Sequence, residues 1–256
     1  MNKVKGCWRE GRAALSAWLQ LPGALHAEAV SRLGYDAVVI DLQHSSINIG
    51  AAAAMLVAIE LGGAEPFVRL QVNDPADAMK LLDLGAYGVI APMVQNAEDA
   101  RRFSSALHYA PRGERSFGPR RPALRYGLRY VESASDTVVG LVMIETRRAL
   151  GNLDEILAVQ GIDGVFVGPT DLALDMGYPP VVDSEQPEVM EAIATIGAKA
   201  RRAGKHAGIF CSGGSSARRR LEQGFDFVTT GPDLGLLTAA AQAALIEARQ
   251  AGRPHE

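Results

Sequence analysis

Short apolar runs recur along the chain, and a longer segment with helical character follows each of them. The runs are rich in Val, Ile and Phe, and several are almost continuously apolar, which is typical of parallel strands covered on both faces. Eight runs are predicted as strands: Ala14–Leu19, Ala37–Asp41, Phe67–Leu70, Gly88–Ala91, Val138–Ile144, Gly164–Val167, Ala207–Phe210 and Phe225–Thr229.

The segments between these runs are rich in Ala, Leu, Glu and Arg, which favour helices. Asp74 and Asn96 each stand where a helix-capping side chain is expected. Helices are predicted at Pro22–Leu33, Gly50–Leu61, Pro75–Leu84, Ala97–Leu107, Leu150–Val159, Pro187–Ala203, Ser215–Gln223 and Leu234–Arg249. The segment Tyr109–Tyr130 holds six arginines with Pro and Gly, interrupts this pattern, and is predicted to be a long ordered loop.

Eight strand–helix units in 256 residues predict one α/β domain, residues 1–256, folded as a (β/α)8 TIM barrel. A doubly wound sheet is the alternative, but no G-x-G-x-x-G follows the first strand. No phosphate-binding P-loop is present either. We therefore expect no organic cofactor.

Composition narrows the set of partners. The net charge of −3 disfavours a nucleic-acid partner, because phosphate contacts need a basic excess or patch. No apolar run approaches the roughly 18 residues that cross a membrane, so we expect no membrane partner. Cys7 and Cys211 are too few for a disulfide scaffold, and the N-terminus lacks the apolar core of a signal peptide. We expect a cytoplasmic protein.

Polar residues at the strand ends are the candidates for chemistry, because the carboxyl ends of barrel strands meet at one mouth. Glu145 and Asp171 follow neighbouring strands, which lie ~4.8 Å apart, so both carboxylates can reach one divalent cation. Two oxygen ligands leave coordination positions for water and substrate. The alternatives are a metal-free acid/base pair and, without any function, two helix-capping acids.

His44 follows the second strand and is a candidate general base, with Asp41 or Asp83 to orient it. Arg69 ends the third strand and suits a carboxylate or enolate oxygen. A loop histidine and a structural ion pair are the alternative interpretations of these two residues. The backbone amides of Gly168–Asp171, at a predicted helix start, form a seat for an anion.

Covalent catalysis is less favoured by the sequence. A Schiff-base mechanism needs a lysine in the mouth, and none of the five lysines ends a predicted strand. Electrostatic activation of the substrate by a metal is therefore favoured. Cys211 is interpreted as a thiol of the pocket wall rather than a nucleophile. The arginines of Arg218–Arg220 and of the long loop are assigned to solvated or subunit-contact surfaces, although one from the loop could reach an acidic substrate.

Several motifs together resemble a known family, the metal-dependent (class II) pyruvate aldolases, which includes 4-hydroxy-2-oxoheptanedioate aldolase and 2-dehydro-3-deoxyglucarate aldolase. The likeness runs from about Gly11 to Glu247. The motifs that carry it are Asp41-Leu42-Gln43-His44, Phe67-Val68-Arg69, Leu82-Asp83-Leu84-Gly85-Ala86, Pro92-Met93-Val94, Tyr109-Ala110-Pro111-Arg112-Gly113-Glu114-Arg115, Ile144-Glu145-Thr146 and Gly164–Leu172.

The resemblance implies a (β/α)8 barrel whose last helix is exchanged between subunits, in a homo-oligomer, a hexamer built from dimers. It implies that Glu145 and Asp171 bind Mg, Mn or Co, and that Arg69 holds the pyruvyl oxygen and the enolate. The remaining roles that it implies are acid/base chemistry at His44 with Asp41 and Asp83 as orienting acids, carboxylate binding at Gly168, Pro169 and Thr170, and an aldehyde-facing wall at Phe210.

The sequence departs from the family pattern at four positions. Gln43 stands where the family often has Glu, and Thr170 and Ala173 stand where Ala and Ser are frequent. Phe210 is bulkier than the expected aliphatic residue. The metal ligands and Arg69 are unaffected, so these departures bear on the aldehyde partner.

The predicted reaction is the reversible aldol cleavage of a 4-hydroxy-2-oxo acid to pyruvate and an aldehyde, through a pyruvate enolate that the metal and Arg69 stabilise. One alternative is an acyl-CoA lyase of the citrate lyase β and malyl-CoA lyase type, which the short loops disfavour. A second is an oxaloacetate decarboxylase, which needs the same enolate. The least favoured is a catalytically silent barrel that serves binding or assembly.

Overall fold

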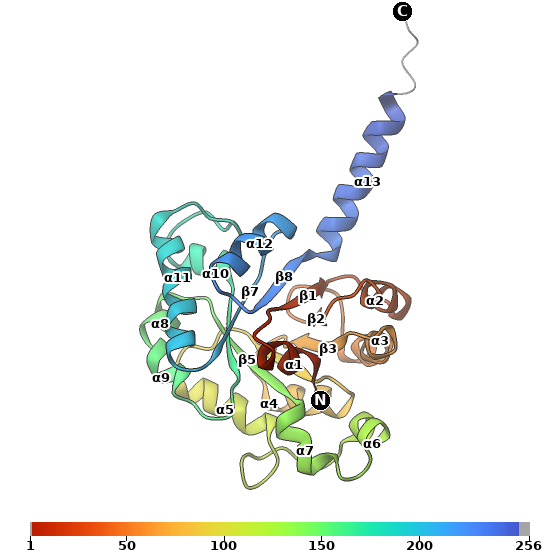
Figure 1. Cartoon of the computed structure of the whole chain (residues 1–256), viewed down its shortest axis with the longest axis vertical. Helices are drawn as coiled ribbons and strands as arrows, with labels where there is room; N and C mark the ends of the chain where they lie inside the picture. Colours follow the sequence, from red (N-terminus) through yellow and green to blue (C-terminus); the bar gives the residue numbers. More distant parts are fainter. Residues whose placement is uncertain (1, 251–256) are drawn as a thin grey trace, which may run out of the picture.

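Eight parallel strands close into a barrel in which each strand pairs with the next along the chain and β8 pairs with β1 (Figure 1). The computed structural model describes residues 2–250. The strands are β1 (Ala14–Leu19), β2 (Ala37–Asp41), β3 (Glu65–Arg69), β4 (Gly88–Ala91), β5 (Val139–Ile144), β6 (Gly164–Val167), β7 (His206–Ile209) and β8 (Phe227–Pro232). The predicted TIM barrel is confirmed.

Helices precede, connect and follow the strands, and those between strands cover the outside of the barrel (Figure 1). They are α1 (Lys3–Arg9), α2 (Ala24–Ser31), α3 (Ile49–Gly62), α4 (Pro75–Asp83), α5 (Ala97–Leu107), α6 (Arg120–Tyr126), α7 (Tyr130–Thr137), α8 (Arg147–Gly151), α9 (Leu153–Leu157), α10 (Pro169–Asp175), α11 (Pro187–Arg202), α12 (Gly214–Glu222) and α13 (Asp233–Gln250).

The apolar strands are explained by burial on both faces. Every residue of β2, β3 and β5 is buried. One apolar cluster fills the layer between the strands and the helices. A second cluster fills the barrel interior, where the ring of Phe227 lies 5.2 Å from that of Phe67 and 6.2 Å from that of Phe166. The interior is thus a packed core and not a pore.

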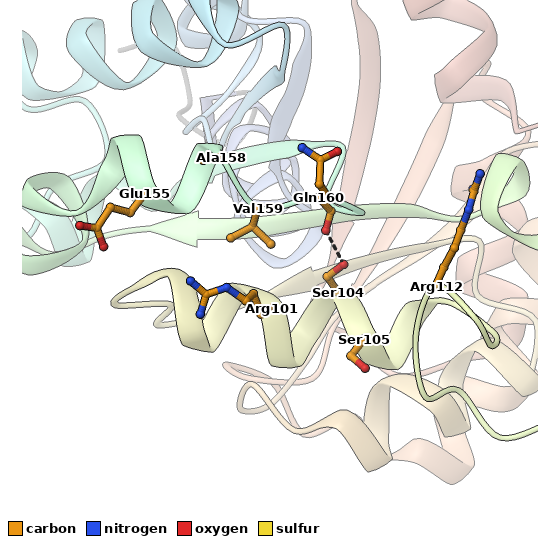
Figure 2. A pocket seen from close by; sticks show the side chains of 8 residues that line it. All are labelled: Arg101, Ser104, Ser105, Arg112, Glu155, Ala158, Val159 and Gln160. Atoms are coloured by element: carbon orange, nitrogen blue, oxygen red, sulfur yellow. Dashed lines mark hydrogen bonds between the residues drawn. The ribbon is translucent and has the colours of Figure 1, made fainter.

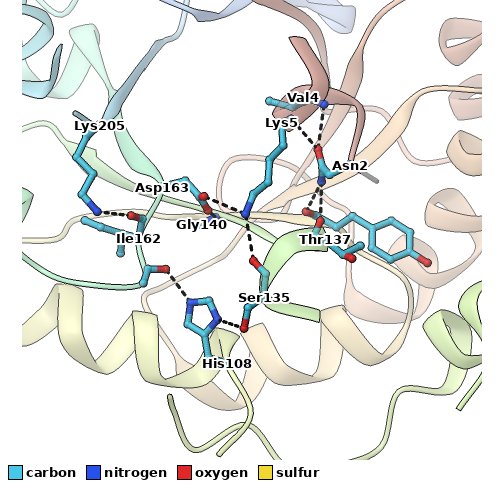
Figure 3. A network of polar contacts seen from close by, with 12 residues as sticks. Asn2, Val4, Lys5, His108, Ser135, Thr137, Gly140, Ile162, Asp163 and Lys205 are labelled. Atoms are coloured by element: carbon cyan, nitrogen blue, oxygen red, sulfur yellow. Dashed lines mark hydrogen bonds and ion pairs between the residues drawn. The ribbon is translucent and has the colours of Figure 1, made fainter. Parts of the chain in front are cut away.

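Helix α1 covers the amino-terminal end of the barrel (Figure 3). The Asn2 side chain accepts a hydrogen bond from the Val4 amide as helix cap and donates to the carbonyls of Tyr87 and Thr137, each at 2.9 Å. Lys5 reaches Asp163 at 3.0 Å. Polar contacts therefore fasten α1 beneath the strands.

Several predicted boundaries differ from the structure. The Arg-rich segment predicted as a loop contains α6, in which Pro122 lies in the first turn, where no backbone N–H partner is needed. The helix predicted over Leu150–Val159 is two short helices joined at Asn152. Strand β8 begins at Phe227 and not at Phe225, because the Phe225 amide still bonds the Arg220 carbonyl at the end of α12.

Helix α13 extends away from the barrel (Figure 1). Its only buried residue is Asp233, whereas its large apolar side chains are about half exposed. They are Leu234, Leu236, Leu237, Leu245 and Ile246. None of the helices over residues 2–250 is long and apolar enough to cross a membrane.

Candidate active site

A cavity of about 220 Å³ opens at the mouth of the barrel, where the carboxyl ends of the strands meet. It brings together most of the predicted site residues with four that were not predicted, Trp18, Gln20, Met143 and Phe166. Its lining consists of Trp18, Gln20, His44, Arg69, Met143, Phe166, Gly168, Pro169, Thr170, Asp171 and Phe210.

Asp41 and Arg69 form a buried ion pair at the edge of this cavity. Arg69 donates to Asp41 Oδ1 from Nε at 2.9 Å and to Oδ2 from Nη2 at 2.6 Å. The Nη1 group of Arg69 bonds to no other residue over 2–250, so it is free to receive a substrate oxygen. The Trp18 ring lies beneath the guanidinium, 4.9 Å from its carbon. A neighbouring carboxylate and an aromatic ring thus fix the direction of Arg69.

Asp41 also fixes the loop that carries His44. Its Oδ1 accepts from the amides of Gln43 and His44, and its Oδ2 accepts from the side chains of Trp18 and Gln20. Although burial opposes it, hydrogen bonding and the charge of Arg69 lower the pKa of Asp41, so it stays ionised. Asp41 therefore orients His44 through the backbone.

Asp83 lies away from His44 within one chain. Helix α4 returns from the mouth toward the amino ends of the strands, and Asp83 is its last residue. There it accepts a hydrogen bond from Arg115 Nη2 at 3.1 Å. A single chain therefore does not bring together the predicted pair of Asp83 and His44.

Glu145 follows β5 directly and is 1% exposed. The Met93 amide donates to its Oε1 at 2.6 Å. Burial, followed by the charge of Asp171, raises the pKa of Glu145 to about 7, while the Met93 amide and the Arg69 charge act in the opposite direction. Asp171 lies in the first turn of α10. The structure thus brings the two predicted acids together.

Gly168 lets these two acids approach each other. A Cβ atom at Gly168 would lie 2.4 Å from Glu145 Oε2 and 3.0 Å from the Met143 methyl, so a larger residue would have to displace the Glu145 carboxylate. Glu145 does not itself line the cavity. Its Oε2 lies against Gly168, which does line the cavity. The α10 turn therefore places Asp171 beside a carboxylate oxygen.

The donor set fits a hard divalent cation bound in part by the protein. Neither Glu145 nor Asp171 forms an ion pair with Lys or Arg within residues 2–250, and two adjacent carboxylates repel each other unless a cation lies between them. Over the same residues, no group of three or more His, Cys, Asp or Glu side chains could hold an ion. Two carboxylates leave the remaining coordination positions to substrate and water.

Aromatic rings form the apolar wall of the cavity. The Trp18 ring stacks on Phe166 at 5.6 Å and meets the edge of Phe210 at 5.3 Å. Trp18 and Gln20 lie at the end of β1 and just after it. Like Arg69, they carry polar groups at the carboxyl end of a predicted strand, so the reasoning that predicted Arg69 applies to them as well.

Cys211 does not line the cavity, contrary to its prediction as a wall thiol. It is fully buried, and burial raises its pKa to about 11, so the thiol stays protonated and is no nucleophile. None of the five lysines lines the cavity either.

A second depression, of about 420 Å³, lies on the outside of the barrel between α5 and α9 (Figure 2). Ser104 donates to the Gln160 carbonyl across it, and Arg101 and Arg112 stand well apart at its rim. It contains none of the predicted site residues, several of which line the smaller cavity at the mouth.

Comparisons with known proteins identify the family of this chain. The sequence profile of the HpcH/HpaI aldolase/citrate lyase family matches residues 15–240. The hydroxypyruvate/pyruvate aldolase of Rhizorhabdus wittichii is 66% identical over 249 residues, covering 97% of this chain and 99% of that protein. The 4-hydroxy-2-oxo-heptane-1,7-dioate aldolase of Shigella sonnei is 40% identical over 248 residues, covering 94% and 93%.

A solved structure extends the likeness to the fold. A HpcH/HpaI aldolase/citrate lyase family protein from Burkholderia cenocepacia superposes with a TM-score of 0.90 at 29% identity, covering 97% of this chain and 100% of that one. The chain described here belongs to the HpcH/HpaI aldolase/citrate lyase family.

Proposed function

We propose that the protein is a divalent-metal-dependent aldolase that reversibly cleaves a 4-hydroxy-2-oxo acid to pyruvate and an aldehyde. The observation that carries the proposal is the pair of adjacent carboxylates, Glu145 and Asp171, which form no ion pair with Lys or Arg within residues 2–250 and lie near Arg69 at the barrel mouth. The names of the R. wittichii and S. sonnei relatives support both the reaction and the donor, which is pyruvate or its 3-hydroxy derivative.

Glu145 and Asp171 hold the cation, which is Mg, Mn or Co. When bound, it supplies Lewis acidity that withdraws electrons from the 2-oxo acid and favours its enolate. The amides of the Gly168–Asp171 turn, with Pro169 and Thr170 in its lining, receive the carboxylate of the 2-oxo acid.

Arg69 stabilises the enolate oxygen. Its charge is permanent, and the bond to Asp41 holds its guanidinium in place before substrate arrives, so little reorganisation is needed as negative charge develops. His44, exposed at the same mouth, takes the proton of the 4-hydroxyl, either directly or through a water, as the C3–C4 bond breaks. In synthesis it returns that proton to the new hydroxyl.

The aldehyde is short and uncharged. Aromatic rings of Trp18, Phe166 and Phe210 line the cavity, and Arg69, already paired with Asp41, is its only Lys or Arg. Among the residues that line this cavity, a second carboxylate on the aldehyde would have to share Arg69 with Asp41 and the enolate oxygen. The cavity of about 220 Å³ also disfavours an acyl-CoA substrate, whereas decarboxylation of oxaloacetate needs the same enolate and is expected as a side reaction of this site.

The working form is a homo-oligomer, a hexamer built from dimers in which α13 is exchanged between subunits. Its support is the row of half-exposed apolar residues on α13, including Leu237 and Leu245, on a helix that leaves its own barrel. The cytoplasm is the proposed compartment, supported by two free, buried thiols.

The direct test is to remove metal with a chelator, restore single ions, and follow solvent exchange of the pyruvate methyl protons. We expect exchange to be lost and then restored by Mg²⁺, Mn²⁺ or Co²⁺, and to be lost again in Glu145→Gln. A screen of pyruvate against neutral and carboxylated aldehydes then identifies the acceptor. Full exchange in the chelated protein would overturn the proposal.

A further inference from the structure

Met93 has an unusual backbone. Among residues 2–250 it is the only non-glycine residue with a positive φ, at 54°, in the left-handed region that L-residues seldom occupy. It lies in the turn between β4 and α5, two residues after the strand ends. Its side chain is 48% exposed, so packing of the thioether does not account for this conformation.

The strained turn is tied to the segment that carries Glu145. Thr146, the next residue, donates from Oγ1 to Gln95 Oε1 at 2.7 Å, and Asn152 donates from Nδ2 to the Gln95 carbonyl at 2.9 Å. A left-handed residue persists only where its surroundings fix it, and such residues cluster at functional sites. Here the surroundings that fix it come from the β5–α9 segment.

This backbone geometry directs the Met93 amide at the Glu145 carboxylate. The Met93 N–H donates to Glu145 Oε1 at 2.6 Å, while Oε2 lies against Gly168, in the turn that leads to Asp171. One oxygen of the carboxylate is therefore occupied, and the other lies on the side of the turn that leads to the second acid.

We propose that Met93 is a positioning residue of the metal site. Its left-handed backbone aims the amide at Oε1 of Glu145, so that Oε2 alone serves as a ligand beside Asp171. This rests on the proposed role of Glu145 as a metal ligand. It assigns the role to the backbone of Met93 and not to its sulfur.

The test compares Mn²⁺ affinity of the full-length protein without substrate, measured from the electron paramagnetic resonance signal of free Mn²⁺. Valine is β-branched and adopts the left-handed region poorly, whereas glycine adopts it freely. We expect Met93→Val to bind Mn²⁺ about tenfold more weakly, the equivalent of one charge-assisted hydrogen bond. Met93→Gly should bind Mn²⁺ almost as tightly as the parent does, although it removes more of the side chain than Met93→Val.

Val72→Ala, an exposed residue of the β3–α4 loop that does not line the cavity, is the matched control and should bind as the parent does. If Met93→Val does not fold, replacing the Met93 amide by an ester through the α-hydroxy acid analogue removes the same donor, and a loss of about tenfold is again expected. Equal Mn²⁺ affinity in Met93→Val and the parent, or an equal loss in the glycine and valine variants, would overturn the inference. Unchanged Mn²⁺ affinity in Glu145→Gln would overturn the metal site itself.

Discussion

Asp41 holds Arg69 through two parallel hydrogen bonds, of 2.9 and 2.6 Å, in a site where Asp41 itself is fully buried. The same carboxylate accepts from Trp18, Gln20 and two amides of the His44 loop. One buried anion thus sets the positions of both the group proposed to stabilise the enolate and the group proposed to move the proton.

Asp41→Asn should therefore impair catalysis strongly. The asparagine amide presents N–H groups to Arg69 where an oxygen is needed, and a displacement of about 1 Å at such a group costs ~100-fold in rate. We expect kcat/KM to fall by about that factor, with folding retained but weakened. The measurement is steady-state aldol cleavage, with far-UV circular dichroism to confirm the fold.

Trp18→Phe is the matched control for this variant, because it removes a single donor to Asp41 and keeps a ring beneath Arg69. Its loss should be about tenfold or less, the scale of one hydrogen bond. Unimpaired turnover in Asp41→Asn would show that Arg69 does not need its buried partner.

The metal-free protein should lose stability as the pH rises toward neutrality. Burial and the nearby Asp171 raise the pKa of Glu145 from 4.5 to about 7. Between these values the folded protein keeps a proton that the unfolded chain has released, so the free energy of unfolding falls as pH rises and levels off above about 7. The contribution is at most about 3 kcal/mol.

Urea denaturation of the chelated protein between pH 5 and 8 measures this effect. Glu145→Gln removes the titration, while every other titrating group remains, so the difference between parent and variant isolates Glu145. The prediction fails if both proteins show the same dependence on pH. Divalent metal should stabilise the parent more at pH 8 than at pH 5, because it binds the ionised carboxylate.

Both thiols should resist alkylation in the folded protein. Burial raises the pKa of Cys211 to about 11 and also raises that of Cys7, and both side chains are almost fully covered. At pH 8 only about one Cys211 in a thousand is a thiolate, even before access is considered. Mass spectrometry after iodoacetamide should show no adduct in buffer and two in urea. Rapid modification of Cys211 with loss of activity would restore a catalytic role for it.

The contacts of α1 should support stability without affecting catalysis. Asn2→Ala removes a helix cap and the side-chain donor to two buried carbonyls, of which that of Tyr87 still accepts from the Val139 amide, and this should cost about 2 kcal/mol. The change lies at the opposite end of the barrel from the mouth, so kcat/KM should stay within about twofold.

Glu10→Ala, at the exposed end of the same helix, is the matched control and should cost within about 0.5 kcal/mol. Urea denaturation and cleavage kinetics check both variants. A loss of activity in Asn2→Ala at full folding would contradict this separation of stability from catalysis.

The sequence predicts the barrel well because strands buried on both faces leave uninterrupted apolar runs, as in Ala37–Asp41, whose bounds agree with the structure. It predicts the arginine-rich segment poorly, because Pro122 and Gly127 have the composition of a loop although they lie in the first turn of α6 and just beyond its end. Tertiary ion pairs explain the helix better, since Arg121 and Arg125 both reach Glu60.

The candidate site, like the fold, is predicted only in part by the sequence. The sequence predicts Arg69, Glu145 and Asp171 because each is a charged residue at or just after a strand end. Burial of a charge at such a position is unfavourable unless the charge has a partner. Met93 escaped this search because its contribution is a backbone N–H, and no side-chain pattern marks a left-handed residue. The sequence did not predict that Asp83 lies away from His44, because the order of motifs does not indicate which end of a barrel a residue occupies.

The barrel interior is packed and α1 lies beneath it, so substrate and product can reach or leave the cavity only through the mouth. In the proposed reaction, the keto acid lies deepest, against Glu145 and Asp171, and the aldehyde lies above it. Turnover should then be ordered, with the aldehyde departing first in cleavage and pyruvate entering first in synthesis. Product inhibition by pyruvate would accordingly be competitive with the cleaved substrate, and that by the aldehyde noncompetitive.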